Sequence, residues 1–146
     1  MSDQPTTESR VEVAWAGKDV FLGTDDAGHS IVFDSALSGA PAKGIGPMKA
    51  LLASLGACSG MDVAAILGKR KQKLVTLKVE VTGKRRQYGH PKPFTDIHVR
   101  YLVGGDRMEE KYVKEAVDDS IKKFCSVAAT IDGRAKITYD YKMVEA

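Results

Sequence analysis

The segment from Met48 to Gln72, MKALLASLGACSGMDVAAILGKRKQ, decides the fold of this protein. Large apolar residues recur on every side of the helix that it predicts, so we expect this helix to be buried. Around Cys58 the side chains shrink to Gly, Ala and Ser, in the run GACSGMD. Gly56 and Gly60 each lower helix stability by about 1 kcal/mol relative to alanine, so some other gain is expected to offset them.

Two interpretations of the small residues around Cys58 are open. In the first, the two glycines let another helix approach closely, and Cys58 is a buried and inert thiol. In the second, the small side chains leave room for a substrate to reach the sulfur. An ordinary thiol is only about 3% ionised at pH 7, so the second interpretation needs help from a cation. A cation about 4 Å away, at an effective dielectric near 20, contributes on the order of 4 kcal/mol, so one Lys or Arg suffices.

The residues before this helix predict a small antiparallel meander. Short apolar runs begin at Val11 (VEVAW), span Val20 to Leu22 and span Ser30 to Phe33, with turn formers between them. The polar residues 1–9 are expected to be disordered. The segment DSALSGAPAKGIGP predicts a loop that leads into the helix, with Pro47 in its first turn.

The residues after the helix predict a hairpin, a second helix and a last strand. LVTLKVEVTG and FTDIHVRYLV alternate apolar and polar residues on either side of the loop QYGHPKP. The predicted dry faces hold Val75, Leu77, Val79 and Val81 in one strand, and Ile97, Val99, Tyr101 and Val103 in the other. An amphipathic helix is expected from Met108 to Phe124, a short helical piece capped by Ser126, and a strand over AKITYDYKMV. The fold class is therefore α+β, with antiparallel sheets.

Composition indicates one soluble domain over residues 1–146. The chain is 43% apolar and 28% charged, and it is long enough to fold without disulfides or a structural metal. A net charge of +3 and 7% aromatic residues do not favour nucleic-acid binding. The polar start lacks a secretion signal, so a cytoplasmic location is expected, where thiols are reduced. Asp62 and Lys49 argue against a membrane span for the apolar helix.

Cys125 is the second cysteine, at the junction between the long second helix and SVAATI. Backbone N–H groups at a helix start favour a thiolate there. If the two sulfurs meet, Cys58 can be oxidised and Cys125 can condense with it. Zinc is the rival interpretation, but the cysteines and the histidines at 29, 90 and 98 lack the paired spacing of zinc ligands. We expect no metal and no cofactor.

Taken together, these residues resemble the OsmC and organic hydroperoxide resistance family, on a divergent branch. The likeness covers about residues 11 to 144 and rests on the helix with Gly-Ala-Cys-Ser followed by Met61-Asp62-Val63, on HPKPFTDIHVRY, and on KKFCSVAAT. It implies an intertwined homodimer with the cysteine helices at its centre. It also implies a peroxidase for small organic hydroperoxides, with Cys58 as the attacking cysteine, Cys125 as the resolving cysteine and a dithiol as reductant.

The sequence departs from the family pattern at two positions. Where the family carries an arginine in the turn after the first strand, this chain has Lys18, and where it carries a glutamate after the helix-opening proline, this chain has Met48. Lysine lacks the planar fork of arginine. Arg10 and Lys49 are further candidates for the activating cation, as are Arg85 and Arg86. The alternative functions are a non-catalytic redox-sensing or small-molecule-binding module, and a purely structural dimer.

Overall fold

The computed structural model describes residues 4–146. The chain divides into two compact units, Met1–Ala50 and Leu51–Ala146, which are described in turn. A single domain over 1–146 stays a prediction. Of the segment predicted to be disordered, residues 1–3 lie outside the described residues, and residues 4–9 contain no helix or strand.

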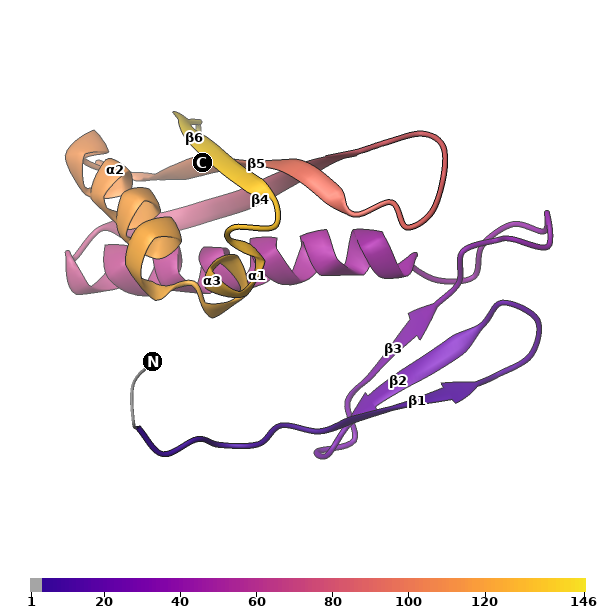
Figure 1. The fold of residues 1–146 in the computed structure, drawn as a ribbon. Helices are drawn as coiled ribbons and strands as arrows, with labels where there is room; N and C mark the ends of the chain where they lie inside the picture. The colour runs from indigo at the N-terminus through magenta and orange to yellow at the C-terminus, as the bar shows by residue number, and fades with distance from the viewer. Residues whose placement is uncertain (1–3) are drawn as a thin grey trace. The chain divides into compact units, whose positions relative to one another are not determined.

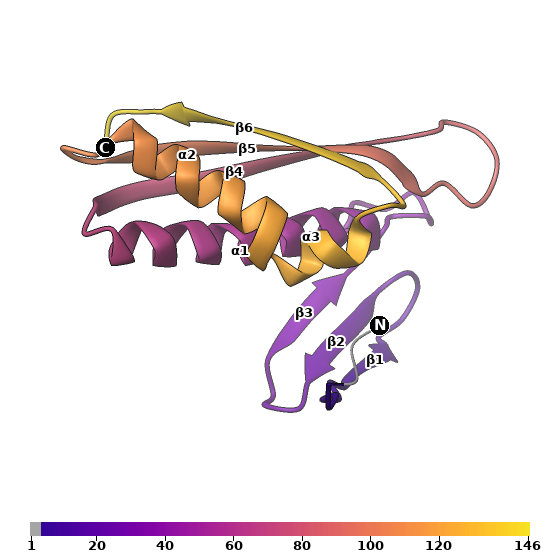
Figure 2. The same ribbon diagram turned by 60° about the vertical axis from the view of Figure 1, so that its left-hand side comes forward.

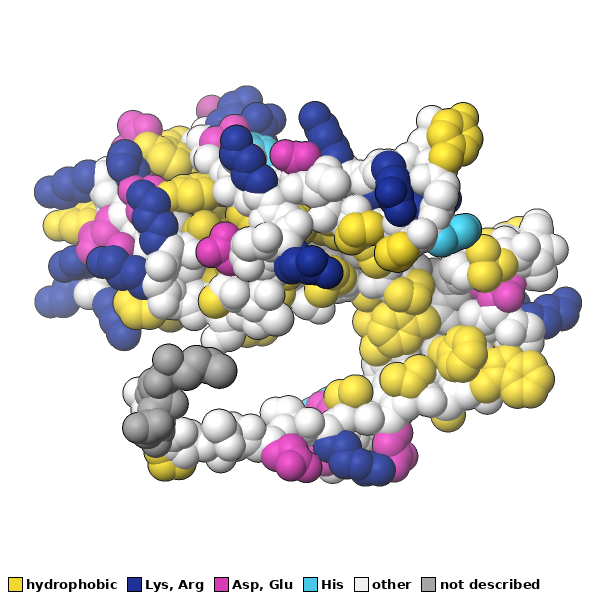
Figure 3. Space-filling view, in the orientation of Figure 1, with side chains coloured by type: hydrophobic (Ala, Val, Ile, Leu, Met, Phe, Trp, Pro, Cys, Tyr) yellow, Lys and Arg dark blue, Asp and Glu magenta, His cyan; other side chains and the backbone are white. Residues whose placement is uncertain are grey.

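The first unit contains a three-stranded antiparallel sheet. Its strands β1 (Val11–Trp15), β2 (Phe21–Asp25) and β3 (Ser30–Phe33) are ordered β1-β2-β3, which confirms the predicted meander. Strand β1 is exposed throughout, and its three largest apolar side chains, Val11, Val13 and Trp15, are 59–69% exposed. Figure 3 shows hydrophobic side chains gathered over this sheet. This unit therefore presents an apolar surface in the single chain.

The loop after β3 is organised by one buried carboxylate. Asp34 is 7% exposed and accepts hydrogen bonds from the backbone N–H groups of Ala36 (2.9 Å) and Lys43 (2.8 Å). These N–H donors lower the pKa of Asp34 by stabilising its charged form. Asp34 thus closes the loop that leads to helix α1 (Pro47–Lys69), which starts at Pro47 as predicted.

In the second unit, helices pack on one face of a second sheet. The sheet has the order β4-β5-β6, made of β4 (Lys73–Arg85), β5 (Phe94–Asp106) and β6 (Lys136–Met143). Helices α1 and α2 (Glu110–Asp119) cover the same face of it (Figures 1 and 2). The core side chains of α1 recur every four residues, at Leu55, Ser59, Val63 and Leu67. Those of β5 recur every two residues, at Ile97, Val99, Tyr101 and Val103. The predicted hairpin of β4 and β5 and the α+β class are confirmed.

The second sheet is mixed, which corrects the prediction of antiparallel sheets. Strands β4 and β5 are antiparallel, but β5 and β6 are parallel. The reason is the long connection from β5 to β6, because its helices return the chain to the starting end of β5 before β6 begins. The sequence pattern of β6 predicted a strand but carried no information about its direction.

A β-bulge corrects the predicted dry face of β4. The pairing of β4 with β5 shifts between Leu74 and Thr76, which leaves Val75 between them without a register partner. Val75 is accordingly 62% exposed, whereas Leu74, Leu77 and Val79 are partly buried. Alternation in the sequence assigned Val75 to the core because strict alternation assumes an unbroken ladder.

Burial of α1 is one-sided, whereas the sequence predicted burial all round. Met61 is 72% exposed and Leu51 is 40% exposed. The helix is long and apolar enough to cross a membrane by length and composition alone, a test that core helices of soluble proteins also pass, and 28% of its most apolar window is buried. Among the described residues it is the one helix of this kind. The single chain therefore leaves an apolar row of α1 uncovered.

The second predicted helix is interrupted near its end. Helix α2 ends at Asp119, a π-helical turn, η1, runs over Ser120–Phe124, and α3 (Ser126–Ile131) follows. The π turn adds one residue to the helical repeat, so Phe124, the last residue of the predicted amphipathic helix, is 57% exposed. Cys125 takes the buried position in its place, at 2% exposure.

Candidate functional site

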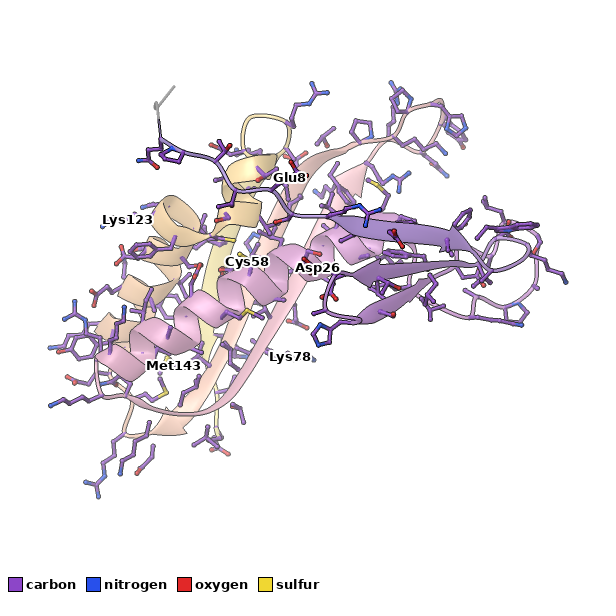
Figure 4. The ribbon with its side chains drawn as sticks, turned by 90° about the horizontal axis from the view of Figure 1, so that it is seen from below. Glu8, Asp26, Cys58, Lys78, Lys123 and Met143 are labelled. Atoms are coloured by element: carbon purple, nitrogen blue, oxygen red, sulfur yellow. The ribbon has the colours of Figure 1, made fainter. Side chains whose placement is uncertain are left out.

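Cys58 lies near the middle of α1 (Figure 4). Its side chain is partly exposed, between the buried Ser59 and the exposed Ala57. Both neighbours are small, so neither covers the sulfur with a long side chain. Cys58 is thus on the border between the face of α1 that packs on the sheet and the face that the single chain leaves open.

The glycines beside Cys58 pack on a strand, which corrects the expectation that they admit another helix. A Cβ atom at Gly56 would lie 3.0 Å from the side chain of Val81, and one at Gly60 would lie 3.4 Å from the side chain of Val79. Both valines belong to β4. The missing Cβ atoms therefore let α1 approach β4 closely, while Cys58, two residues from each glycine, lies on a different side of the helix.

Cys125 is positioned by the π turn and by the helix that follows. Its backbone N–H donates to the carbonyl of Ser120 at 2.7 Å, which closes the π turn. Its Sγ accepts a hydrogen bond from the N–H of Ala128 at 3.4 Å, so Cys125 itself is the N-cap of α3. Ser126, the cap expected from the sequence, is instead the first residue of that helix. A thiol at an N-cap is unusual, since oxygen side chains are preferred there.

The fold brings the two cysteines together. The side chain of Cys58 lies close enough to the Cys125 thiol to raise its pKa. Burial raises the pKa of Cys125 to about 11, the N–H of Ala128 lowers it, and the Cys58 thiol raises it. Burial therefore outweighs the helix start, and Cys125 is a neutral thiol at pH 7. The sequence favoured a thiolate at Cys125, and this expectation is wrong because it could not include the depth of burial.

A buried chain of hydroxyl groups lies beside the cysteines and was not found from the sequence. Tyr101 of β5 forms a hydrogen bond with Ser59 of α1, and Ser59 Oγ lies 2.6 Å from Ser120 Oγ in the π turn. Ser120 Oγ in turn donates to Asp62 Oδ2 at 3.0 Å. Tyr101, Ser59 and Ser120 are each 0% exposed. The available signal was Ser120, which continues the buried spacing of Val113, Ala116 and Val117 although it is polar.

Of the five predicted cation candidates, Arg10, Lys18 and Lys49 belong to the first unit, and Arg85 and Arg86 belong to the second. Arg10 forms an ion pair with Glu12 at 2.8 Å. Lys18 occupies a left-handed conformation (φ 48) in the turn after β1, and its carbonyl accepts a hydrogen bond from the Trp15 indole at 2.8 Å. Lys49 is exposed in the first turn of α1, about 13.5 Å of helical rise before Cys58. The activating cation stays a prediction.

Residues that could hold a metal do not gather around the thiols. Among residues 4–146 no group of three or more His, Cys, Asp or Glu side chains is arranged to bind an ion. His98 instead pairs with Thr138 (2.7 Å) and Asp140 (3.2 Å) on the outer face of the second sheet.

Comparison with known proteins places this arrangement in a family. OsmC-like protein, a protein family, matches residues 40–140. Protein YhfA of Escherichia coli K12 is 35% identical over 137 residues, which cover 94% of this chain and 99% of YhfA.

Solved structures agree over almost the whole chain. A hypothetical protein from Aquifex aeolicus VF5 has a TM-score of 0.84 and 32% identity, covering 97% of this chain and 99% of that chain. The organic hydroperoxide resistance protein OhrB of Bacillus subtilis has a TM-score of 0.62 and 18% identity, over 93% and 98% of the two chains, a likeness of fold. Since the family match spans more than half of the chain and YhfA aligns with nearly all of it, this chain belongs to the OsmC-like family.

Proposed function

We propose that this protein is a cysteine-based peroxidase that reduces small organic hydroperoxides in the cytoplasm, as part of oxidative-stress defence. The observation that carries the proposal is the contact between a partly exposed thiol, Cys58, and a buried neutral thiol, Cys125. Only Cys58 is accessible to a substrate, so the two sulfurs are suited to different steps. The fold likeness to organic hydroperoxide resistance proteins supports the same assignment.

The proposed reaction has two chemical steps on the protein. The Cys58 thiolate attacks the terminal oxygen of the hydroperoxide, the O–O bond breaks, and the alkoxide takes a proton and leaves as the alcohol. Cys58 is then a sulfenic acid. In the second step Cys125 attacks the Cys58 sulfur, a disulfide forms, and the sulfenic oxygen leaves as water with the Cys125 proton. A dithiol reductant then restores both thiols by exchange and becomes a disulfide itself.

The raised pKa of Cys125 suits the second role. A neutral buried thiol does not compete for peroxide, because the thiolate is the nucleophile. It loses its proton only when the sulfenic acid beside it provides a leaving hydroxide. A cation that keeps Cys58 ionised is still required, and Lys18, Arg10 and Lys49 are the proposed sources.

The peroxidase proposal is tested with purified protein, cumene hydroperoxide and an excess of a dithiol. The wild-type protein should consume the peroxide, and Cys58→Ser should abolish consumption. In a separate experiment without dithiol, Cys125→Ser should consume one equivalent of peroxide per chain and hold Cys58 as a sulfenic acid. Equal consumption by wild type and Cys58→Ser would refute the proposal.

A non-catalytic redox sensor or binding module on the same fold is the second candidate. The observation that favours it is the first turn of α1, which contains no acidic residue and has Met48 where the peroxidase pattern has a glutamate. A sensor would form the disulfide once and turn over no peroxide. Slow alkylation of Cys58 at pH 7, as expected for a thiol of pKa near or above about 8.5, would favour this function.

We also propose that two copies form an intertwined homodimer. The apolar row on α1 around Met61 and the exposed side of β1 are the surfaces that a second copy would cover. Soluble proteins rarely expose large contiguous apolar areas, and a stable dimer buries roughly 1,600 Å² in total. Sedimentation should give twice the mass of one chain, and Met61→Glu should lower it toward one chain. A monomeric wild type at micromolar concentration would contradict the proposal.

A further inference from the structure

The chain Tyr101–Ser59–Ser120–Asp62 has one consistent arrangement of hydrogens. A carboxylate can only accept, so Asp62 receives the Ser120 hydrogen at 3.0 Å. Each hydroxyl has a single hydrogen, so Ser59 must then donate to Ser120, and Tyr101 must donate to Ser59. The longer contact from Ser120 Oγ to the carbonyl of Ser59, 3.4 Å, competes for the same hydrogen. Because both acceptors take the Ser120 hydrogen, the other two bonds run toward Ser120, and Asp62 is the nearer acceptor.

These hydrogen bonds connect the residues next to Cys58 with those next to Cys125. Ser59 directly follows Cys58 on α1, and the carbonyl of Ser120 accepts the N–H of Cys125 at 2.7 Å. Tyr101 ties Ser59, and through Ser59 also Ser120, to the central strand of the sheet. A displacement of Ser120 from α1 would therefore move the π turn and Cys125 with it.

The π turn decides which residue faces α1. In an α-helix, the residue four after Ser120 would occupy the same face, which is Phe124. With the π turn that face receives Cys125, at 2% exposure, while Phe124 is 57% exposed. An exposed phenylalanine is unfavourable relative to a buried one, so contacts elsewhere must stabilise the turn.

Core packing alone does not account for three hydroxyls at these positions. Their helical and strand neighbours in the core are Leu55, Val63 and Val99, which need no partner. Buried hydroxyls cost free energy unless they are paired, and a fully paired network mainly enforces one arrangement. We propose that these hydrogen-bonded hydroxyl groups are a positioning element. They hold the π turn against α1, so that the Cys125 thiol stays within reach of Cys58. The proposal rests on the proposed function in one respect, that Cys58 and Cys125 form a disulfide during turnover. Its test does not require peroxide.

The test measures how readily the two thiols form a disulfide. Protein is equilibrated with oxidised and reduced dithiothreitol, where two protein thiols give up two electrons and two protons as the oxidised reagent is reduced. The disulfide is quantified by thiol titration and intact mass. Ser120→Ala removes the hydroxyl that accepts from Ser59 and donates to Asp62, and it should lower the equilibrium constant about fivefold to thirtyfold.

Tyr139→Phe is the matched control. It removes a tyrosine hydroxyl from the same sheet, one that donates to Asp118 of α2 at 2.8 Å and is not a member of the chain. Its disulfide equilibrium should stay within about twofold of wild type, although its stability also falls. A merely structural effect would lower the equilibrium constant for disulfide formation equally in Ser120→Ala and Tyr139→Phe.

A pair of variants at Asp62 covers the case in which Ser120→Ala fails to fold. Asp62 is only partly buried, so both substitutions are tolerated by the core. Asp62→Asn keeps an oxygen that accepts from Ser120 and should retain the wild-type equilibrium, whereas Asp62→Ala should lower it. Equal constants in Asp62→Ala and Asp62→Asn, or a wild type that forms no disulfide, would overturn the inference. Failure of the peroxidase proposal would appear separately, as disulfide formation without hydroperoxide turnover.

Discussion

Replacing Gly60 with alanine should stabilise this protein, although the glycine lies within a turn of Cys58. A Cβ atom there would lie 3.4 Å from Val79 Cγ2, which is an ordinary contact. Alanine is favoured over glycine in a helix interior by about 0.8–1 kcal/mol, partly because the unfolded chain is less free. With no clash to subtract, Gly60→Ala should raise the free energy of unfolding by about 1 kcal/mol. For a chain of this size the melting temperature should rise by roughly 2–4 °C.

Gly56→Ala is the matched comparison, since it gains the same helix propensity. Its Cβ would lie 3.0 Å from Val81 Cγ2, so the valine must move by a few tenths of an ångström. Overpacking of this kind costs about 1–3 kcal/mol, which cancels or exceeds the gain. The two variants should therefore differ by at least about 1 kcal/mol, with Gly60→Ala the more stable.

Urea unfolding followed by circular dichroism measures the difference, with all proteins at one concentration because association shifts apparent stability. Disulfide equilibrium with dithiothreitol should be unchanged in Gly60→Ala. A Gly60→Ala variant less stable than wild type by 0.5 kcal/mol or more, roughly the limit of surface effects, would refute the packing of this glycine on β4.

Three further outcomes are expected. The folded-state pKa of Cys125 is raised from 9.0 to about 11, so folding favours the neutral thiol. This contribution to stability is complete below about pH 9 and is lost as the pH rises toward 11. The free energy of unfolding, measured with urea, should therefore fall over that range more in wild type than in Cys125→Ser. Val75→Thr should change the free energy of unfolding by less than about 0.5 kcal/mol, because Val75 is 62% exposed at the bulge. Val79→Thr should lower it by about 1–3 kcal/mol, because Val79 is partly buried. Equal losses of stability in thermal unfolding would contradict the bulge. Asp34→Ala should lower the free energy of unfolding at pH 7, measured with urea. The difference from wild type should shrink as the pH falls through the lowered pKa of Asp34, because the charged form is the one that the N–H groups stabilise. A difference that is independent of pH would contradict the role of the carboxylate.

Local patterns determined most of the secondary structure. Proline geometry predicts the start of α1 at Pro47. Alternation predicts the strand at Ser30–Phe33 and the dry face of β5. Both signals depend on neighbouring residues only. The two cysteine contexts also identified the family, because each cysteine is surrounded by matching residues. These features are encoded within a few residues of chain, so the sequence alone was sufficient for them.

Tertiary packing decided the features that local patterns could not predict. The π turn over Ser120–Phe124, the bulge at Val75 and the parallel pairing of β6 each depend on contacts with residues far away in the chain. The pKa of Cys125 likewise depends on its burial and on Cys58, whereas its helix-start position alone predicted the opposite direction. Periodicity reports which side of an element is apolar, but desolvation and long-range hydrogen bonds arise only when the elements meet.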